Sequence, residues 1–175
     1  DFLENRTDKK TVDLCSGSGA IAVALDKISG AKVTAVEIDE TAFSYLETNV
    51  KENNSSVKPV MADALEICET FADGELDLIV SNPPYIKSAD IETLQKEVRL
   101  EPRLALDGGE DGCDFYREIV SRWSRKLKKG GALAFELGEN QADAVKALMT
   151  DKGFSDFKIS LDFGGVQRAI IGTLL

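Results

Sequence analysis

The chain has 175 residues, 43% of them hydrophobic, and a formal net charge of −10 with no histidine. This length and composition suffice for one hydrophobic core, so we expect a single domain. The acidic balance, with an isoelectric point near 4.6, argues against binding to a phosphate backbone, which needs lysine and arginine. Without histidine, any chemistry of this chain must proceed without an imidazole for proton transfer.

Targeting and cysteine signals are absent from the sequence. No apolar run approaches the roughly 20 residues that cross a bilayer, and the first ten residues lack a signal-peptide pattern. We therefore expect a soluble, cytoplasmic protein without a membrane partner, and take a monomer as the default. Cys15, Cys68 and Cys113 are widely spaced and have no CxxC or histidine partner, so the sequence suggests neither a disulfide framework nor a metal site.

Apolar runs alternate with amphipathic stretches, which is typical of a parallel sheet with helices on both faces. The predicted strands are Thr11–Cys15, Lys32–Glu37, Val57–Met61, Leu76–Ser81 and Ala132–Leu137. The predicted helices are Ala20–Lys27, Thr41–Glu52, Phe115–Leu127 and Ala142–Asp151. The strands Phe154–Leu161 and Gln167–Leu174, joined by a turn-forming cluster, predict a terminal antiparallel hairpin. The predicted fold class is α/β, with a Rossmann-like, mostly parallel sheet of seven strands.

A long irregular stretch runs from about Pro83 to Asp114, directly after the fourth predicted strand. Connections of this length are uncommon in compact domains and often carry function. We expect this stretch to contribute to the site.

The first predicted strand runs into the glycine-rich turn Cys15-Ser16-Gly17-Ser18-Gly19 and then directly into a helix. Glycines let a backbone turn tightly and approach a ligand closely. Glu37 ends the second strand about twenty residues later, where a carboxylate can accept hydrogen bonds from ribose hydroxyls. The pair indicates an adenosine-type site. The same turn also satisfies a relaxed dinucleotide fingerprint, so a nicotinamide enzyme stays open, as does a glycine turn that serves only chain reversal.

Asp63 follows the third strand and so reaches the same edge of the sheet, where ligands of open α/β folds bind. It could accept a hydrogen bond from the exocyclic amine of an adenine. It could equally cap the short apolar segment Ala64–Cys68. Both readings remain open from the sequence.

The strongest signal is Asn82-Pro83-Pro84-Tyr85, at the end of the fourth strand. Two prolines fix the backbone, so its carbonyls become rigid acceptors. The Asn82 side-chain oxygen and the Pro83 carbonyl can each accept one N–H of a planar amide or amino group, which aims the nitrogen lone pair at an electrophilic carbon. Tyr85 offers a flat face for such a group. A rigid stop to the strand is the structural alternative.

At this point the sequence resembles the class I S-adenosylmethionine-dependent methyltransferases, specifically the protein-glutamine N5-methyltransferases of the HemK/PrmC type that modify peptide chain release factors. The resemblance covers nearly the whole chain. It rests on Asp13 to Gly19, on Glu37, on residues 82–85, on Glu101-Pro102 with Ala105-Leu106 and Gly108-Gly109 with Asp111-Gly112, and on Glu136-Leu137-Gly138 followed by Gln141.

The resemblance implies S-adenosylmethionine as cofactor, S-adenosylhomocysteine as product, and the glutamine of a Gly-Gly-Gln loop in a class I release factor as methyl acceptor. The implied cofactor-binding residues are Asp13, Cys15, Ser16, Gly17, Ser18, Gly19, Glu37, Ile38, Asp63, Ala64 and Asn82. The implied substrate-holding, catalytic residues are Asn82, Pro83, Pro84 and Tyr85, with Glu101 and Pro102 near the substrate mouth.

Two departures from the family pattern stand out. Cys15-Ser16 replaces the Gly-Thr of many relatives, which is tolerable if position 15 needs no positive φ. The helical N-terminal domain and Arg-Pro linker of the family precede the first strand in relatives and are not seen in this sequence. We expect the chain to be the catalytic domain. Methylation of another protein's glutamine or of a nucleic-acid base, and a non-catalytic binding module, remain as alternatives.

Overall fold

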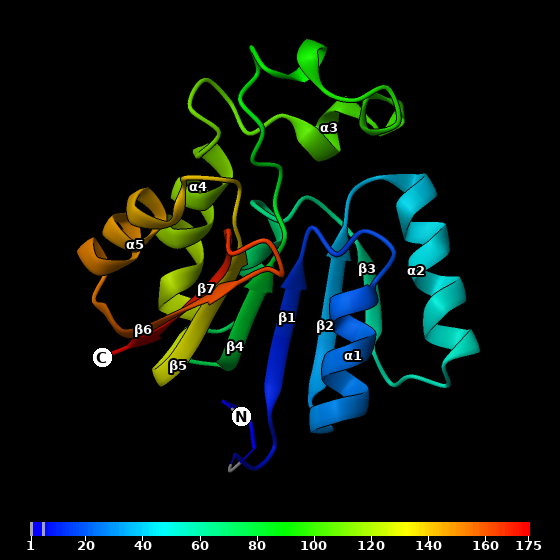
Figure 1. Cartoon of the computed structure of the whole chain (residues 1–175). Coiled ribbons are helices and arrows are strands. Elements are labelled where there is room, and N and C mark those ends of the chain that lie inside the picture. Colours follow the sequence, from blue (N-terminus) through cyan, green and yellow to red (C-terminus); the bar gives the residue numbers. More distant parts are fainter. Residues whose placement is uncertain (1, 5) are drawn as a thin grey trace.

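The computed structural model describes residues 2–4 and 6–175, which form one seven-stranded sheet flanked by helices (Figure 1). The strand order is β3-β2-β1-β4-β5-β7-β6, with β5–β7 and β7–β6 antiparallel and the other pairs parallel. The strands are β1 (Lys10–Leu14), β2 (Lys32–Glu37), β3 (Lys58–Met61), β4 (Leu76–Ser81), β5 (Leu127–Glu136), β6 (Phe154–Leu161) and β7 (Gln167–Leu174). The predicted fold class is confirmed.

Helices cover both faces of the sheet. The helices are α1 (Ala20–Ser29), α2 (Glu40–Glu52), α3 (Arg103–Leu106), α4 (Asp114–Trp123) and α5 (Ala142–Asp151). Short 3-10 turns occupy Ile67–Thr70, Ile91–Thr93, Val98–Leu100 and Ser124–Lys126. None of the helices in the described part of the chain is long and apolar enough to cross a bilayer.

Two hydrophobic cores lie on opposite faces of the sheet. On one face, Ala22 of α1 and Leu46 of α2 pack with Val33 and Leu78 of the strands. On the other, Trp123 of α4 and Val145 of α5 belong to one buried cluster with strand residues. All six residues of β4 are buried, which explains its nearly continuous apolar run.

Several predicted bounds differ from the structure by one or two residues, and the largest errors lie at the end of α4 and the start of β5. The helix expected to run to Leu127 ends at Trp123, and β5 begins at Leu127 instead of Ala132. Leu127 pairs with Leu76 of β4, and the register then shifts before Ala132. Gly130, at φ +72°, lies in this irregular stretch. A bulge with glycine interrupts strand periodicity, so the sequence pattern concealed the first half of the strand.

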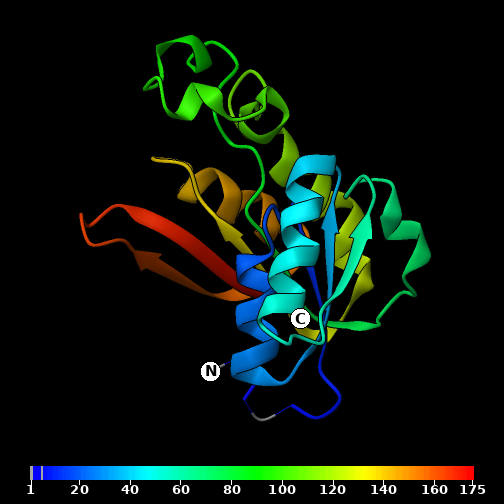
Figure 2. The ribbon, with the colours of Figure 1, turned by 90° about the vertical axis from the view of Figure 1, so that its right-hand side faces the viewer.

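The terminal hairpin has the predicted bounds. β6 and β7 pair along the edge of the sheet and project from the rest of the molecule (Figure 2). Asp162 holds the connecting turn by accepting hydrogen bonds from the amides of Gly164 (2.8 Å) and Val166 (3.0 Å). The antiparallel ending is therefore fixed by local turn chemistry.

Candidate active site

A cavity of about 130 Å³ lies at the carboxyl edge of the parallel strands. This is the edge where ligands bind in open α/β sheets. Segments far apart in the sequence line it: Cys15, Val36, Glu37, Ile38, Asp39, Ala62, Asp63, Ala64, Leu65, Asn82, Pro84, Pro102, Leu104, Ala105 and Phe115. Figure 1 shows the chain between β4 and α4, including α3, above the carboxyl ends of the strands.

The glycine turn, residues 15–19, is held tightly to the end of β2. The Ser16 amide donates to the Val36 carbonyl (3.0 Å), and the Gly19 amide donates to the Ser16 carbonyl (2.8 Å). Gly19 has φ +82°, and a Cβ there would overlap the Leu46 side chain. Gly17 has φ +55°, but a Cβ there would meet nothing within 4 Å. The turn therefore needs glycine at position 19 for packing and presents open space beside position 17.

Cys15 corrects one expectation. Its φ is +56°, so the condition on which cysteine would be tolerable at position 15, the absence of a positive φ, is not met. Cysteine here adopts the left-handed conformation that favours glycine, so the turn contains backbone strain. Burial, followed by the Glu37 carboxylate, raises the pKa of Cys15 to about 12. Its thiol stays protonated at neutral pH and is a poor nucleophile.

Glu37 is buried, and its carboxylate accepts three backbone N–H groups. The Gly17 amide donates to Oε2 (2.7 Å), while the amides of Ile38 and Asp39 donate to Oε1 (2.9 and 2.8 Å). A carboxylate offers about four acceptor positions, so capacity remains for a ligand hydroxyl. Glu37 thus ties the glycine turn to β2 and also lines the cavity.

Asp13 is the unsatisfied group of the site. It is fully buried at the end of β1, and neither carboxylate oxygen has a hydrogen-bond partner among the described residues. Burial raises the pKa of Asp13 to about 7, and the nearby Glu37 carboxylate adds to this shift. A buried, unpaired carboxylate beside the glycine turn suits a cationic ligand.

Asp63 takes part both in the cavity lining and in the local turn that follows it. It lines the cavity, and its Oδ1 accepts the Leu65 amide (2.7 Å), so it also caps the local turn. It does not cap an α-helix, because the 3-10 turn after it begins at Ile67. One carboxylate oxygen serves the turn, which leaves the other for a ligand.

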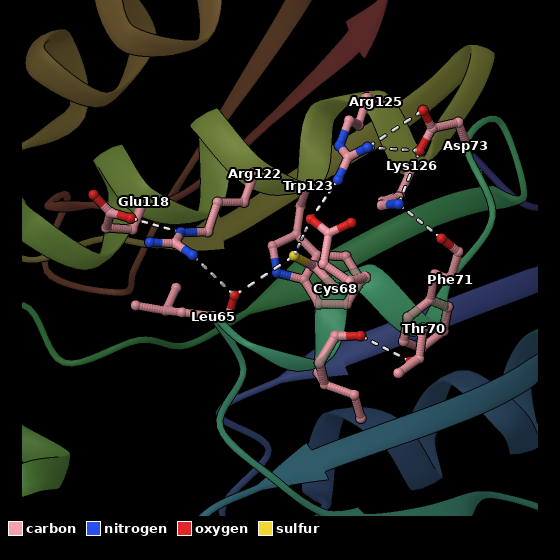
Figure 3. A network of polar contacts seen from close by, with 12 residues as sticks. Leu65, Cys68, Thr70, Phe71, Asp73, Glu118, Arg122, Trp123, Arg125 and Lys126 are labelled. Atoms are coloured by element: carbon pink, nitrogen blue, oxygen red, sulfur yellow. Dashed lines mark hydrogen bonds and ion pairs between the residues drawn. The ribbon is translucent and has the colours of Figure 1, made fainter.

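A polar network from the α4 side fixes the chain that follows Asp63 (Figure 3). The Trp123 indole donates to the Ala64 carbonyl (2.9 Å). Lys126 donates to the Phe71 carbonyl (2.7 Å) and pairs with Asp73 (2.8 Å), while Arg125 pairs with Glu69 and Asp73. The Trp123 bond supports the cavity wall formed by residues 63–65, and the Lys126 and Arg125 contacts hold the chain that follows it, from Glu69 to Asp73.

Residues 82–85, here called the acceptor segment, follow β4 directly. The Ser81 hydroxyl donates to the Leu14 carbonyl (2.8 Å), which joins the ends of β4 and β1. Asn82 is exposed and lines the cavity, whereas Pro83 and Pro84 are buried. The two prolines therefore anchor the segment while its asparagine faces the site.

Tyr85 is half-buried beside this cavity, and its hydroxyl lies 3.5 Å from Glu136 Oε1. Burial, followed by the Glu136 carboxylate, raises the pKa of Tyr85. The phenol therefore stays neutral at physiological pH and can act as a donor or a flat surface, but not as a base.

Residues 86–113, here called the cap segment, return to the acceptor segment. The Ile86 amide donates to the Leu106 carbonyl (2.9 Å), and the Gly108 amide donates to the Ile86 carbonyl (2.8 Å). These bonds place Pro102, Leu104 and Ala105 against the cavity. The irregular stretch singled out from the sequence thus forms part of the site.

The structure brings together only part of the predicted site in the cavity lining. Predicted residues that line it are Cys15, Glu37, Ile38, Asp63, Ala64, Asn82, Pro84 and Pro102. Predicted residues outside the lining are Asp13, Ser16, Gly17, Ser18, Gly19, Pro83, Tyr85 and Glu101. Lining residues that sequence reasoning missed are Val36, Asp39, Ala62, Leu65, Leu104, Ala105 and Phe115. Asp39 carried a usable signal, because it is the N-cap of α2 two residues after Glu37. Among the apolar lining residues of the cap segment, Ala105 belongs to a motif that carries the family resemblance, whereas Leu104 carried no signal.

The chain is similar to known methyltransferases in sequence and in structure. A protein of Geobacter sulfurreducens named release factor glutamine methyltransferase is 42% identical over 93% of this chain and 57% of its own length. A protein of Clostridium acetobutylicum with the same name is 36% identical over 98% of this chain and 61% of its own length. The chain therefore spans about three fifths of these curated relatives.

Solved structures show the same fold. A methyltransferase from Pyrococcus furiosus superposes with a TM-score of 0.73 at 24% identity, covering 98% of this chain and 79% of that one. A precorrin-6y methyltransferase from Geobacter metallireducens superposes with a TM-score of 0.71 at 13% identity, covering 99% and 83%.

The sequence profile of the family described as "Methyltransferase small domain" matches residues 1–103, which is more than half of the chain. This match favours a methyltransferase over the nicotinamide enzyme that the glycine turn also allowed, because a methyltransferase profile does not describe a nicotinamide dehydrogenase. The chain therefore belongs to the methyltransferase small domain family.

Proposed function

We propose that this chain is the catalytic domain of an enzyme that methylates the side-chain amide nitrogen of the glutamine in the Gly-Gly-Gln loop of a class I peptide chain release factor. One observation carries the proposal: Asn82 shares a single cavity with Cys15 of the glycine turn and with Glu37. A nucleophile held by the acceptor segment would therefore face a ligand held by the turn. The names of the two curated relatives support the choice of acceptor.

The residues around the glycine turn fit S-adenosylmethionine. Glu37 has capacity for ribose hydroxyls, and the open space beside Gly17 admits a ligand against the backbone. The unpaired Asp13 carboxylate favours a positive charge nearby. When bound, this cofactor would supply an electrophilic methyl carbon on a positively charged sulfur and would leave as S-adenosylhomocysteine.

The acceptor segment would supply the orientation. An amide nitrogen is a weak nucleophile because its lone pair is delocalised, so its direction must be controlled. The Asn82 side-chain oxygen and the Pro83 carbonyl would each accept one amide N–H, and the Tyr85 ring would lie against the amide plane. As positive charge grows on nitrogen, these carbonyl dipoles stabilise it, and the proton then leaves to water. This mechanism needs no strong base, which suits a chain without histidine.

Transfer of labelled methyl groups tests the proposal. The chain would be mixed with labelled S-adenosylmethionine and either a class I release factor or the same factor with its Gly-Gly-Gln glutamine replaced by alanine. Label on the first factor and not on the second supports the proposal. The proposal also implies that the protein acts in the cytoplasm, where termination factors work. Ribosomal proteins and oligonucleotides serve as competing acceptors, and preferential labelling of either would overturn the choice of substrate.

Calorimetric titration separates the cofactor question from the acceptor question. S-adenosylmethionine should bind and NAD should not. Binding of S-adenosylmethionine without transfer to any acceptor would identify the chain as a binding module and reject the catalytic proposal.

A further inference from the structure

Gln141 lies outside the cavity and the catalytic scheme, yet it is a buried amide whose nitrogen and oxygen both bond within the protein. It is 8% exposed and immediately precedes α5. Its Nε2 donates to the carbonyls of Tyr85 (2.9 Å) and Gly112 (3.1 Å). Its Oε1 accepts the Gly138 amide (3.0 Å) and lies 3.3 Å from the Tyr116 hydroxyl.

These partners leave only one orientation for the side-chain amide. Two carbonyl oxygens can bond only to its nitrogen, and a backbone N–H can bond only to its oxygen. Three chain segments far apart in the sequence, ending at Tyr85, Gly112 and Gly138, therefore meet at one side chain. Leaving any of these buried groups unpaired is unfavourable, so the junction is rigid when complete.

Three glycines let the backbone segments come this close to Tyr85. A Cβ on Gly108 would lie 2.7 Å from the Tyr85 Cα and 2.9 Å from the Pro84 carbonyl oxygen. A Cβ on Gly112 would overlap the Tyr85 carbonyl, and one on Gly138 would lie 3.0 Å from the Tyr85 ring. The glycines of two sequence motifs thus pack directly around the end of the acceptor segment.

We propose that Gln141, with Gly108, Gly112 and Gly138, forms a clamp that fixes the direction of the acceptor segment, and that Gln141 is a positioning residue for methyl transfer. The inference rests on the proposed function and deepens it. Gln141 acts through the Tyr85 carbonyl and touches no reacting atom. Its loss should disturb the orientation of the nucleophile while leaving intact the cofactor half of the cavity, which the glycine turn and Glu37 form.

The test compares Gln141→Leu with Gln167→Leu, a matched change at the exposed start of β7. Gln141→Leu should lower kcat about 10²-fold, as small misplacements of reacting groups do, with cofactor Kd changed less than about threefold. Hydrogen exchange at the Ile86 and Gly108 amides, which bond across this junction, should accelerate at least about tenfold. Gln167→Leu should change none of these quantities.

The outcomes distinguish a failure of the proposed clamp from a failure of the proposed function. Unchanged kcat and exchange in Gln141→Leu would overturn the clamp. So would a loss of cofactor affinity that matches the loss in kcat, because the residue would then support the whole pocket. If the unmodified chain transfers no methyl group, the proposed function fails, while hydrogen exchange still decides the clamp.

Gln141→Glu covers the case in which the leucine variant does not fold. A carboxylate cannot donate to the Tyr85 and Gly112 carbonyls, whereas a protonated carboxyl can donate to one, so activity relative to the unmodified chain should rise as pH falls from about 8 to about 6. Burial raises the pKa of Tyr85, Tyr116 and Cys113 around this position, so they stay neutral in that range. The charged neighbours Glu136, Asp111 and Arg168 are common to both proteins and cancel in the ratio. A ratio independent of pH would overturn the clamp.

Discussion

The glycine turn and the acceptor segment meet at one cavity, but their geometries are determined at different distances along the chain. The Glu37 carboxylate accepts the amides of Gly17, Ile38 and Asp39. The cofactor half of the cavity, meaning the glycine turn and Glu37, is therefore built at the ends of two neighbouring strands, β1 and β2. The acceptor segment depends on Gln141, whose side chain bonds across separations of 29 and 56 residues.

The halves also differ in how their buried polar groups are satisfied. Both N–H groups of the Gln141 side chain and its oxygen bond within the protein, whereas both oxygens of Asp13 are without partners among the described residues. A satisfied network is rigid and costs little to keep, but an unpaired buried carboxylate costs stability. The comparison indicates that the acceptor segment is preorganised, whereas the Asp13 carboxylate beside the glycine turn lacks a compensating partner among the described residues.

The largest expected effect separates the two halves directly. Asn82→Ala should lower kcat roughly 10³-fold, because one preoriented carbonyl would be lost from the nucleophile. Cofactor Kd should stay within about tenfold, since Glu37 and the glycine turn remain. Steady-state kinetics with calorimetry measures both. A collapse of cofactor affinity would place Asn82 chiefly in the cofactor half.

The next effect concerns Asp13 and pH. Because the folded-state pKa is raised to about 7 from the ordinary 3.8, the folded chain retains a proton that the unfolded chain loses, and stability falls as pH rises between these values. Asp13→Asn should therefore increase the free energy of unfolding by about 2–4 kcal/mol at pH 8, with the gain shrinking toward pH 4. Urea unfolding at several pH values measures it.

Asp77 is the matched control for this experiment. It is also a buried strand carboxylate, but it accepts the Lys10 amide (3.0 Å) and pairs with Lys128 (2.7 Å) and Arg6 (3.2 Å). Asp77→Asn should lower stability at neutral pH, opposite in sign to Asp13→Asn. If both variants changed the free energy of unfolding in the same direction, the proposed difference between the unpaired Asp13 and the paired Asp77 would be wrong.

A smaller effect is expected for Glu37→Ala. Loss of its charge-assisted hydrogen bonds should weaken cofactor binding by about 1–3 kcal/mol, while kcat at saturating cofactor stays within about threefold. Calorimetric Kd and kcat are the measurements. An unchanged Kd would remove Glu37 from the ribose site and leave it as a brace of the glycine turn.

The smallest effect tests the local strain of the glycine turn. Cys15→Gly should be more stable than Cys15→Ala by about 1 kcal/mol, because only glycine relieves the left-handed backbone. At Cys68, in the 3-10 turn without positive φ, alanine should be the more stable of the two. Urea unfolding of the four variants measures the difference. If the alanine variant were the more stable of the two at both positions, backbone strain at Cys15 would be unimportant.

The sequence alone determined the sheet, most element bounds and the residues at the ends of β1, β2 and β4, because hydrophobic periodicity and turn residues act over a few positions. β2, β4, α5 and the terminal hairpin strands have the predicted bounds. The start of β5 did not follow, since its register depends on pairing with β4 across a bulge.

Only the tertiary structure decided how the acceptor segment is held and what lines the cavity. Leu104 and Phe115 carry no local pattern that marks a ligand wall, and the motif that contains Gln141 does not reveal which groups its side chain bonds to. Their roles come from contacts between segments that the fold brings together. Cys15 teaches the same point for the backbone, because composition does not reveal that its position has positive φ.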